Sequence, residues 1–131
     1  MIALDTNVVV RFLVEDDAKQ VRRVRQLLEA AVEAGEPCFL SDCVLCEIEW
    51  VLESNYGARR ADIGSAVQHL IEQGNFVFED VGAVGRALEL YRTGKADLSD
   101  CLIGQRARSK GARTTFTFDR ALRGAAEFTV L

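Results

Sequence analysis

Some residues on which common enzymes depend are scarce in this chain. Its 131 residues include one histidine, His69, and one proline, Pro37, and only 8% are aromatic. The histidine falls on a helical segment where we predict partial exposure, so no Ser–His or Cys–His nucleophile pair is expected. No glycine-rich loop follows any predicted strand, which argues against the phosphate-binding loops of nucleotide-binding folds.

Long apolar runs are also missing. No stretch approaches the roughly 20 apolar residues that a membrane-spanning helix needs. A charged residue, Asp5, appears too early for the apolar core of a secretory signal. We therefore expect a cytoplasmic protein without a membrane partner.

The chain has no excess of positive charge. It carries 16 Lys and Arg against 20 Asp and Glu, a net charge of −4. This balance alone argues mildly against a nucleic-acid binder. One basic group near the C-terminus is a weak candidate for contacts with a phosphate backbone. It comprises Arg106, Arg108, Lys110 and Arg113.

The four cysteines do not form a recognisable metal or redox site. Cys43 and Cys46 have the C-x-x-C spacing, but there is no second close Cys or His pair. We interpret all four, with Cys38 and Cys101, as small reduced core residues, and no structural zinc is expected.

Strand-like and helical segments alternate along the whole chain. With 49% apolar and 27% charged residues, the sequence indicates one globular domain, residues 1–131, of the α/β class with a parallel sheet. We predict strands at 2–4, 38–40, 76–78, 114–118 and 127–131, and helices at 8–14, 18–34, 42–56, 61–71, 81–92 and 97–110. Asn7 is a plausible N-cap for the first helix.

Two acids lie where predicted strands end. Asp5 follows the apolar strand Ile2–Leu4, and Asp119 follows the strand that ends at Phe118. Ligands of parallel sheets gather beyond the carboxyl ends of the strands, so both positions favour chemistry. For Asp5 the alternative is a structural role as a helix N-cap or turn residue.

A third acid is expected on the helix 42–56. Glu47 and Glu49 lie about 160° apart on a helical wheel, so both cannot face one site. We predict that Glu47 lies among apolar neighbours, since Val44 and Val51 are three and four residues away, and that Glu49 faces outward with Glu53.

Asp97 and Asp100 lie three residues apart at a predicted helix start and share one face. We expect this face to continue through Ile103 and Gly104 to Ala107, against the sheet. Asp97 alone would be explained by the helix dipole, but two carboxylates this close repel each other unless a proton or cation lies between them. Oxygen ligands in this number suit Mg²⁺ or Mn²⁺ better than zinc.

Four short motifs, in this order and spacing, resemble the PIN domain, and within it the VapC-type toxins of bacterial toxin–antitoxin pairs. They are Leu4-Asp5-Thr6-Asn7, the segment Leu45–Leu52, the segment Ala96–Ile103, and Thr117-Phe118-Asp119-Arg120. The resemblance covers essentially the whole chain. Cys46 and Cys101 stand where aliphatic or small residues are more usual.

The resemblance implies a three-layer α/β/α fold with a five-stranded parallel sheet and a Mg²⁺- or Mn²⁺-dependent endoribonuclease of one or two ions. It also implies a homodimer and a small cognate antitoxin of the VapB type. The catalytic acids carry over to Asp5, Glu47, Asp100 and Asp119, and the metal-binding positions to Asp5, Asp97, Asp100 and Asp119. Polar positions that orient ligands or water carry over to Thr6, Asn7 and Thr117.

Two other functions are weighed against this one. Phosphatases of the haloacid-dehalogenase type also place an Asp at the end of their first strand, but they need a second Asp where this chain has Asn7. The non-enzymatic alternative is an inert PIN-like scaffold that binds a protein partner or RNA.

Overall fold

The computed structural model describes residues 1–131 and contains helices alternating with short parallel strands. The N-terminal half contains β1 (Ile2–Ala3), α1 (Thr6–Leu13), α2 (Ala18–Glu33), β2 (Cys38–Leu40), α3 (Asp42–Tyr56) and α4 (Arg60–Ile71). The C-terminal half contains β3 (Phe76–Phe78), α5 (Val81–Thr93), α6 (Leu98–Ser109), β4 (Thr115–Thr117), the 3₁₀ turn η1 (Arg120–Leu122) and β5 (Phe128–Val130). The predicted element types are thus confirmed, with boundaries that differ by a few residues.

Side-chain caps explain where several of the helices begin. Ser41 accepts a hydrogen bond from Val44 N (3.2 Å), and Asp80 accepts one from Ala83 N (2.9 Å). The first helix is present, but Asn7 was the wrong N-cap, and the alternative of Asp5 as a cap is what the structure shows. The carboxylate of Asp5 accepts from Thr6 N, and Asn7 lies inside the helix.

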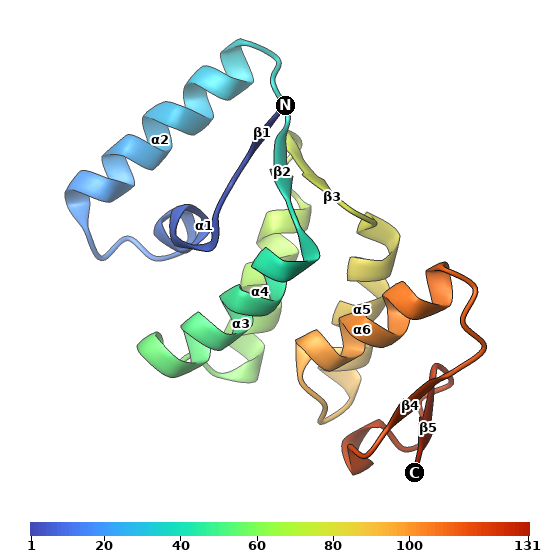
Figure 1. The fold of residues 1–131 in the computed structure, drawn as a ribbon. Coiled ribbons are helices and arrows are strands. Elements are labelled where there is room, and N and C mark those ends of the chain that lie inside the picture. Colours follow the sequence, from blue (N-terminus) through green and yellow to red (C-terminus); the bar gives the residue numbers. More distant parts are fainter.

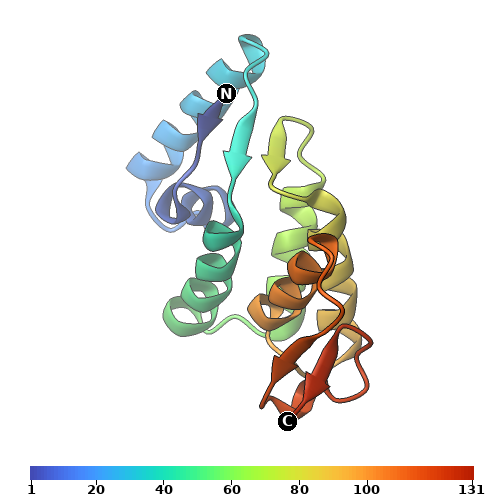
Figure 2. The same ribbon diagram turned by 45° about the vertical axis from the view of Figure 1, so that its right-hand side comes forward.

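The strands form two separate parallel sheets. In the first, β2 lies between β1 and β3, with Ile2 opposite Cys38 and Cys38 opposite Phe76. In the second, β4 pairs with β5, and Thr115 lies opposite Phe128. The expectation of one five-stranded sheet is therefore wrong. The two sheets lie at opposite ends of the group formed by α3, α4, α5 and α6 (Figures 1 and 2).

The packing of the C-terminal segment on α6 accounts for this division. Gly104 of α6 lies directly against the ring of Phe128 in β5. The short connection from Ser109 to Thr115 keeps β4 near the end of the same helix. Because β5 is seated on α6, β4 pairs with β5, and the outer edge of β1 has no strand beside it.

The core runs through most of the helices and the three-stranded sheet. Its fully buried side chains include Leu40, Leu45, Ile48 and Leu70, and Leu122 of η1 joins the same cluster. None of the helices is both long and apolar enough to cross a bilayer.

Substitution of Gly104 by Ala is expected to destabilise the fold by about 1.5 kcal/mol, since overpacking of a core typically costs 1–3 kcal/mol. An added Cβ would overlap Cζ and Cε2 of Phe128. Urea unfolding measures the loss, and Gly85→Ala on α5, where an added Cβ meets nothing within 4 Å, is the matched control. A Gly104→Ala/Phe128→Leu double variant that fails to recover stability would contradict this explanation.

Candidate active site

The first group of site residues joins the end of β1 to α3. Thr6 is buried, and its hydroxyl donates to Glu47 Oε2 over 2.6 Å. Asp5 Oδ1 accepts from Thr6 N over 2.7 Å. Asp5 and Glu47 are nevertheless exposed residues, although both of their carboxylates are held by the buried Thr6. The prediction that Glu47 is surrounded by apolar side chains was wrong.

The second group lies at the start of α6 and the end of β4. Asp97 is the N-cap residue of α6, and Asp100 lies in the first turn. Burial raises the pKa of Asp100, and the negative charges of Asp97, Asp119 and Glu49 raise it further. Acids from three segments that are far apart in sequence therefore act on one carboxylate.

The carboxylates of the second group are largely free of protein partners. Asp97 makes no capping hydrogen bond, and no hydrogen bond contributes to the raised pKa of Asp100. Asp119 uses Oδ1 to accept from Ala121 N (2.9 Å) at the start of η1. Thr117 Oγ1 accepts from Asp119 N over 3.0 Å and so holds the end of β4, whereas Asn7 is an exposed residue of α1.

The site residues thus lie in two groups, defined here as the β1 group (Asp5, Thr6 and Glu47) and the α6 group (Asp97, Asp100 and Asp119). No three acidic, Cys or His side chains converge closely enough to hold a metal ion. Electrostatic repulsion acts over longer distances than a metal–ligand bond. The acids can therefore raise the pKa of Asp100 without lying close enough together to coordinate one ion directly. The oxygen donors of the α6 group fit a hydrated Mg²⁺ or Mn²⁺, which typically binds protein through one or two carboxylates and keeps several waters.

Glu49 is the site residue that the sequence patterns missed. It was expected to face outward, but it is only 6% exposed. Its carboxylate accepts from Leu98 N (2.6 Å) and Ser99 N (3.0 Å) at the start of α6. Its spacing could have indicated burial, because Leu45 lies four residues before it and Leu52 three residues after, and both are core residues.

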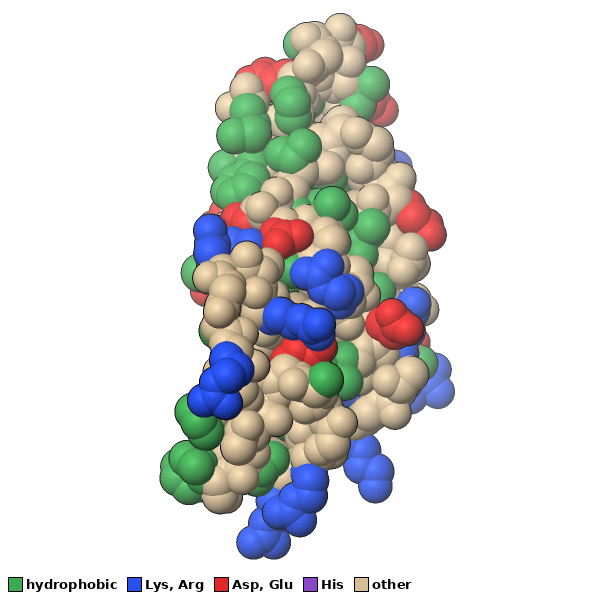
Figure 3. All heavy atoms as spheres, turned by 90° about the vertical axis from the view of Figure 1, so that its right-hand side faces the viewer, with side chains coloured by type: hydrophobic (Ala, Val, Ile, Leu, Met, Phe, Trp, Pro, Cys, Tyr) green, Lys and Arg blue, Asp and Glu red, His purple; other side chains and the backbone are tan.

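Two of the four predicted basic residues form ion pairs, and the other two do not. Arg106 pairs with Asp42, Glu79 and Asp80, and Arg108 pairs with Glu127, so both arginines already have carboxylate partners, and the expected phosphate contacts of the four basic residues stay a prediction. Lys110 and Arg113 are exposed and make no ion pair. On the face shown in Figure 3, basic side chains are scattered with acidic ones between them, without a continuous positive stripe.

The cysteines behave only partly as expected. All four are free thiols, and Cys38 and Cys101 are buried, but Cys43 is exposed and Cys46 is partly buried. Burial raises the pKa of both Cys46 and Cys101 to about 11. These two thiols therefore stay protonated near neutral pH, as inert packing residues do.

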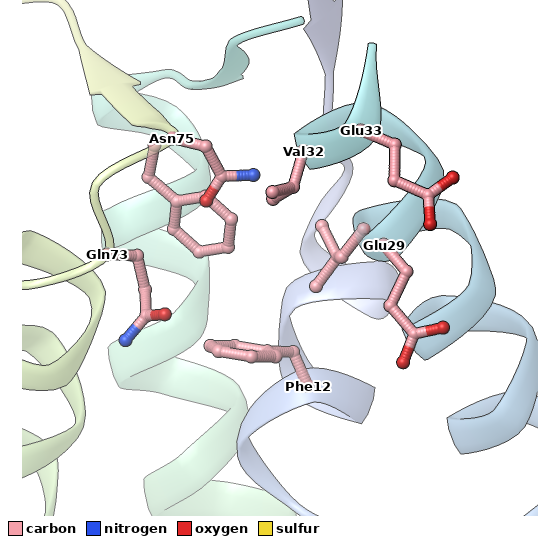
Figure 4. Close-up of a pocket in the computed structure, with 8 residues that line it drawn as sticks. Phe12, Glu29, Val32, Glu33, Gln73 and Asn75 are labelled. Atoms are coloured by element: carbon pink, nitrogen blue, oxygen red, sulfur yellow. The ribbon is translucent and has the colours of Figure 1, made fainter. Parts of the chain in front are cut away.

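The cavity drawn in Figure 4 lies away from the β1 and α6 groups. It has a volume of about 340 Å³ and lies between α1, α2 and the start of β3. Phe12, Val32 and Phe76 supply apolar walls, and Glu29 and Glu33 of α2 lie at its side. It includes no residue of the β1 or α6 group.

Comparison with known proteins identifies the family of this chain. The sequence model of the PIN domain matches residues 2–127. A curated relative, the VapC ribonuclease of Aquifex aeolicus (strain VF5), is 29% identical over 117 residues, which cover 89% of this chain and 86% of the relative. No solved structure matches the chain. Since the PIN match spans nearly all of its length, this chain belongs to the PIN domain family.

Proposed function

We propose that this protein is a metal-dependent endoribonuclease that hydrolyses RNA phosphodiester bonds, and that it is the toxin of a type II toxin–antitoxin system. Membership of the PIN family and the similarity to a VapC ribonuclease support the reaction. The observation that carries the proposal is the α6 group. Asp97 and Asp100 have carboxylates without protein hydrogen bonds, beside the further charge of Asp119.

The α6 group is the proposed binding position for one or two Mg²⁺ or Mn²⁺ ions. Asp100, with Asp97 or Asp119, would hold an ion directly or through water. When bound, such an ion lowers the pKa of a water molecule and neutralises charge on the phosphoryl oxygens. No Lys or Arg forms an ion pair with Asp97, Asp100 or Asp119. The negative charges of these three acids are therefore not neutralised by the protein and can attract a cation.

We propose that the β1 group supports the same reaction. The hydroxyl of Thr6 donates a hydrogen bond to Glu47, and its backbone N–H donates one to Asp5. One buried residue therefore holds both acids. Asn7 and Thr117 are proposed to orient water or ligands next to these acids. Lys110 and Arg113, which make no ion pair, are proposed contacts for the RNA backbone, in preference to Arg106 and Arg108.

The similarity to a VapC ribonuclease supports a proposal for the cellular setting. We propose a cytoplasmic homodimer that is held inactive by a VapB-like antitoxin. Light scattering over a range of concentrations tests the dimer. A small open reading frame next to this one, whose product co-purifies with the chain, would support the antitoxin.

The deciding experiment is cleavage of RNA by purified, antitoxin-free protein in Mg²⁺ or Mn²⁺. EDTA and the variant Asp100→Asn are the controls, and both should abolish cleavage. Cleavage that survives both indicates a contaminating nuclease. A well-folded protein that cleaves no RNA would favour the alternative, an inert PIN scaffold that binds a protein partner or RNA.

Two variants of Asp5 separate its capping role from a role in the reaction. Asp5→Asn keeps an oxygen that can accept from Thr6 N, so we expect a melting temperature near that of the wild type and a loss of cleavage. Asp5→Ala should also lose about 1 kcal/mol of stability with the cap. Full cleavage by Asp5→Asn would restrict Asp5 to the capping role.

A further inference from the structure

A buried carboxylate from α3 holds the start of α6. Glu49 accepts from the backbone N–H groups of Leu98 and Ser99, one with each oxygen, at 2.6 and 3.0 Å. It is 6% exposed and makes no ion pair with Lys or Arg. Leu98 is the first residue of α6, so Glu49 satisfies two of the N–H groups that a helix leaves open at its N-terminus. An anion is also favoured there by the helix dipole.

This contact changes what Asp97 can do. Asp97 has the extended backbone of an N-cap residue (φ −67°, ψ 151°), yet its side chain makes no capping hydrogen bond. Helix α3 shows the usual alternative, since the side chain of its N-cap residue, Ser41, itself accepts from Val44 N and holds the helix start. Glu49 thus occupies two of the open N–H groups of α6, and the carboxylate of Asp97 makes no capping hydrogen bond and stays free.

The segment before Asp97 is held in place from a second direction. Arg60 at the start of α4 donates to the carbonyl oxygens of Tyr91 (2.7 Å) and Ala96 (3.0 Å), and its guanidinium lies 4.1 Å from the centre of the Tyr91 ring. Arg60 thus fixes the carbonyl groups that precede Asp97, while Glu49 fixes the N–H groups that follow it. The backbone on both sides of Asp97 is tied to other helices.

We propose that Glu49 is a positioning residue: it takes over the capping of α6 and thereby keeps Asp97 and Asp100 free and correctly oriented for a divalent cation. The cation is part of the proposed function, on which this inference rests. The role is distinct from binding the ion, because both oxygens of Glu49 are already occupied by backbone N–H groups.

Mn²⁺ binding by the intact protein without RNA tests this role. Glu49→Gln presents an NH₂ group to one of the two N–H groups, so Asp97 should turn back to cap its own helix. We expect Mn²⁺ affinity to fall about tenfold, which is the lower end of the loss seen when a residue that orients a metal ligand is removed. Glu53→Gln, which removes an exposed charge one turn later on the same helix, is the matched control and should leave the affinity unchanged.

A second variant separates positioning from simple attraction by charge. Glu49→Asp retains the negative charge, but its side chain is one methylene shorter and cannot span both N–H groups from the same backbone position. The inference expects Glu49→Asp to bind Mn²⁺ as weakly as Glu49→Gln. If Glu49→Asp binds Mn²⁺ as the wild type does, or if Glu49→Gln keeps the wild-type affinity, the positioning role is overturned.

Amide hydrogen exchange provides a readout that does not need the metal. Exchange at Leu98 and Ser99 should accelerate in both Glu49 variants and not in Glu53→Gln. If the wild type neither binds Mn²⁺ nor cleaves RNA, the proposed function fails, and unchanged exchange at these two amides would separately overturn the capping role of Glu49. Faster exchange with unchanged Mn²⁺ affinity would reduce Glu49 to a purely structural residue.

Discussion

The variant Asp100→Asn is expected to lose RNA cleavage by a factor on the order of 100 or more, which corresponds to about 3 kcal/mol of transition-state stabilisation. Asp100 is the carboxylate on which burial and the charges of Asp97, Asp119 and Glu49 all act. Its asparagine analogue keeps the shape but offers a cation no negative charge. Single-turnover cleavage of a defined RNA in Mn²⁺ measures the loss.

The same variant should be more stable than the wild type when no cation is present. Replacing Asp100 removes a partly buried charge and its repulsion from three acids, so we expect the melting temperature in EDTA to rise by roughly 2–4 °C, the range for about 1 kcal/mol in a domain of this order of size. Glu89→Gln, an exposed residue on α5, is the control and should change neither property. Lower stability of Asp100→Asn would show that Asp100 serves the fold instead.

The variant Arg106→Gln is expected to cost about 2–3 kcal/mol in the free energy of unfolding, slightly less than the loss of one partner from a fully buried ion pair. Arg106 Nε lies 2.7 Å from Asp42 Oδ2, and its other nitrogens lie 3.4 Å from Asp80 and 3.6 Å from Glu79. The side chains of Arg106 and Asp42 are only 23% and 20% exposed. Removing the arginine leaves three carboxylates close together at the ends of β2 and β3.

The pH dependence of this variant follows from Asp42. Burial raises the pKa of Asp42, the charge of Glu79 raises it further, and Arg106 opposes both. Without Arg106 the pKa in the folded state rises further, so the folded protein binds a proton more readily than the unfolded chain above the ordinary value of 3.8. Stability is then lost as the pH rises through this window and regained as it falls. The deficit of Arg106→Gln should therefore shrink as the pH is lowered from neutral toward the ordinary pKa of Asp42.

Urea unfolding at several pH values measures both effects. Arg108→Gln, two residues further along α6, is the control. Arg108 is 61% exposed although its partner Glu127 is only 12% exposed, so we expect the loss of this single, half-exposed pair to cost less than the loss of Arg106. Equal stability of Arg106→Gln and the wild type at neutral pH would mean that solvent already screens the three carboxylates.

The acids of the site were predictable to different degrees. The positions of Asp5, Asp97, Asp100 and Asp119 at strand ends or helix starts were predicted correctly, because such ends are visible as local changes in sequence pattern. Glu47 and Glu49 were assigned to the wrong environments. Both lie in the middle of one helix, where the number of neighbours depends on what packs against that helix. The spacing of Glu49 from Leu45 and Leu52 was a local hint of burial, but the start of α6, which covers Glu49, lies 49 residues later in the sequence.

The sequence by itself determined the order and type of the helices and strands, since these depend on residues within one or two turns, such as the caps Ser41 and Asp80 and the glycine that ends α3. The tertiary structure alone decided which strands pair, which glutamate is buried and which arginines are neutralised. Those outcomes depend on contacts between distant segments: Phe128 on Gly104, Glu49 on Leu98, and Arg106 on Asp42. At each of these contacts, the burial and charge of a residue depend on the segment that packs against it, and the local sequence does not indicate which segment that is.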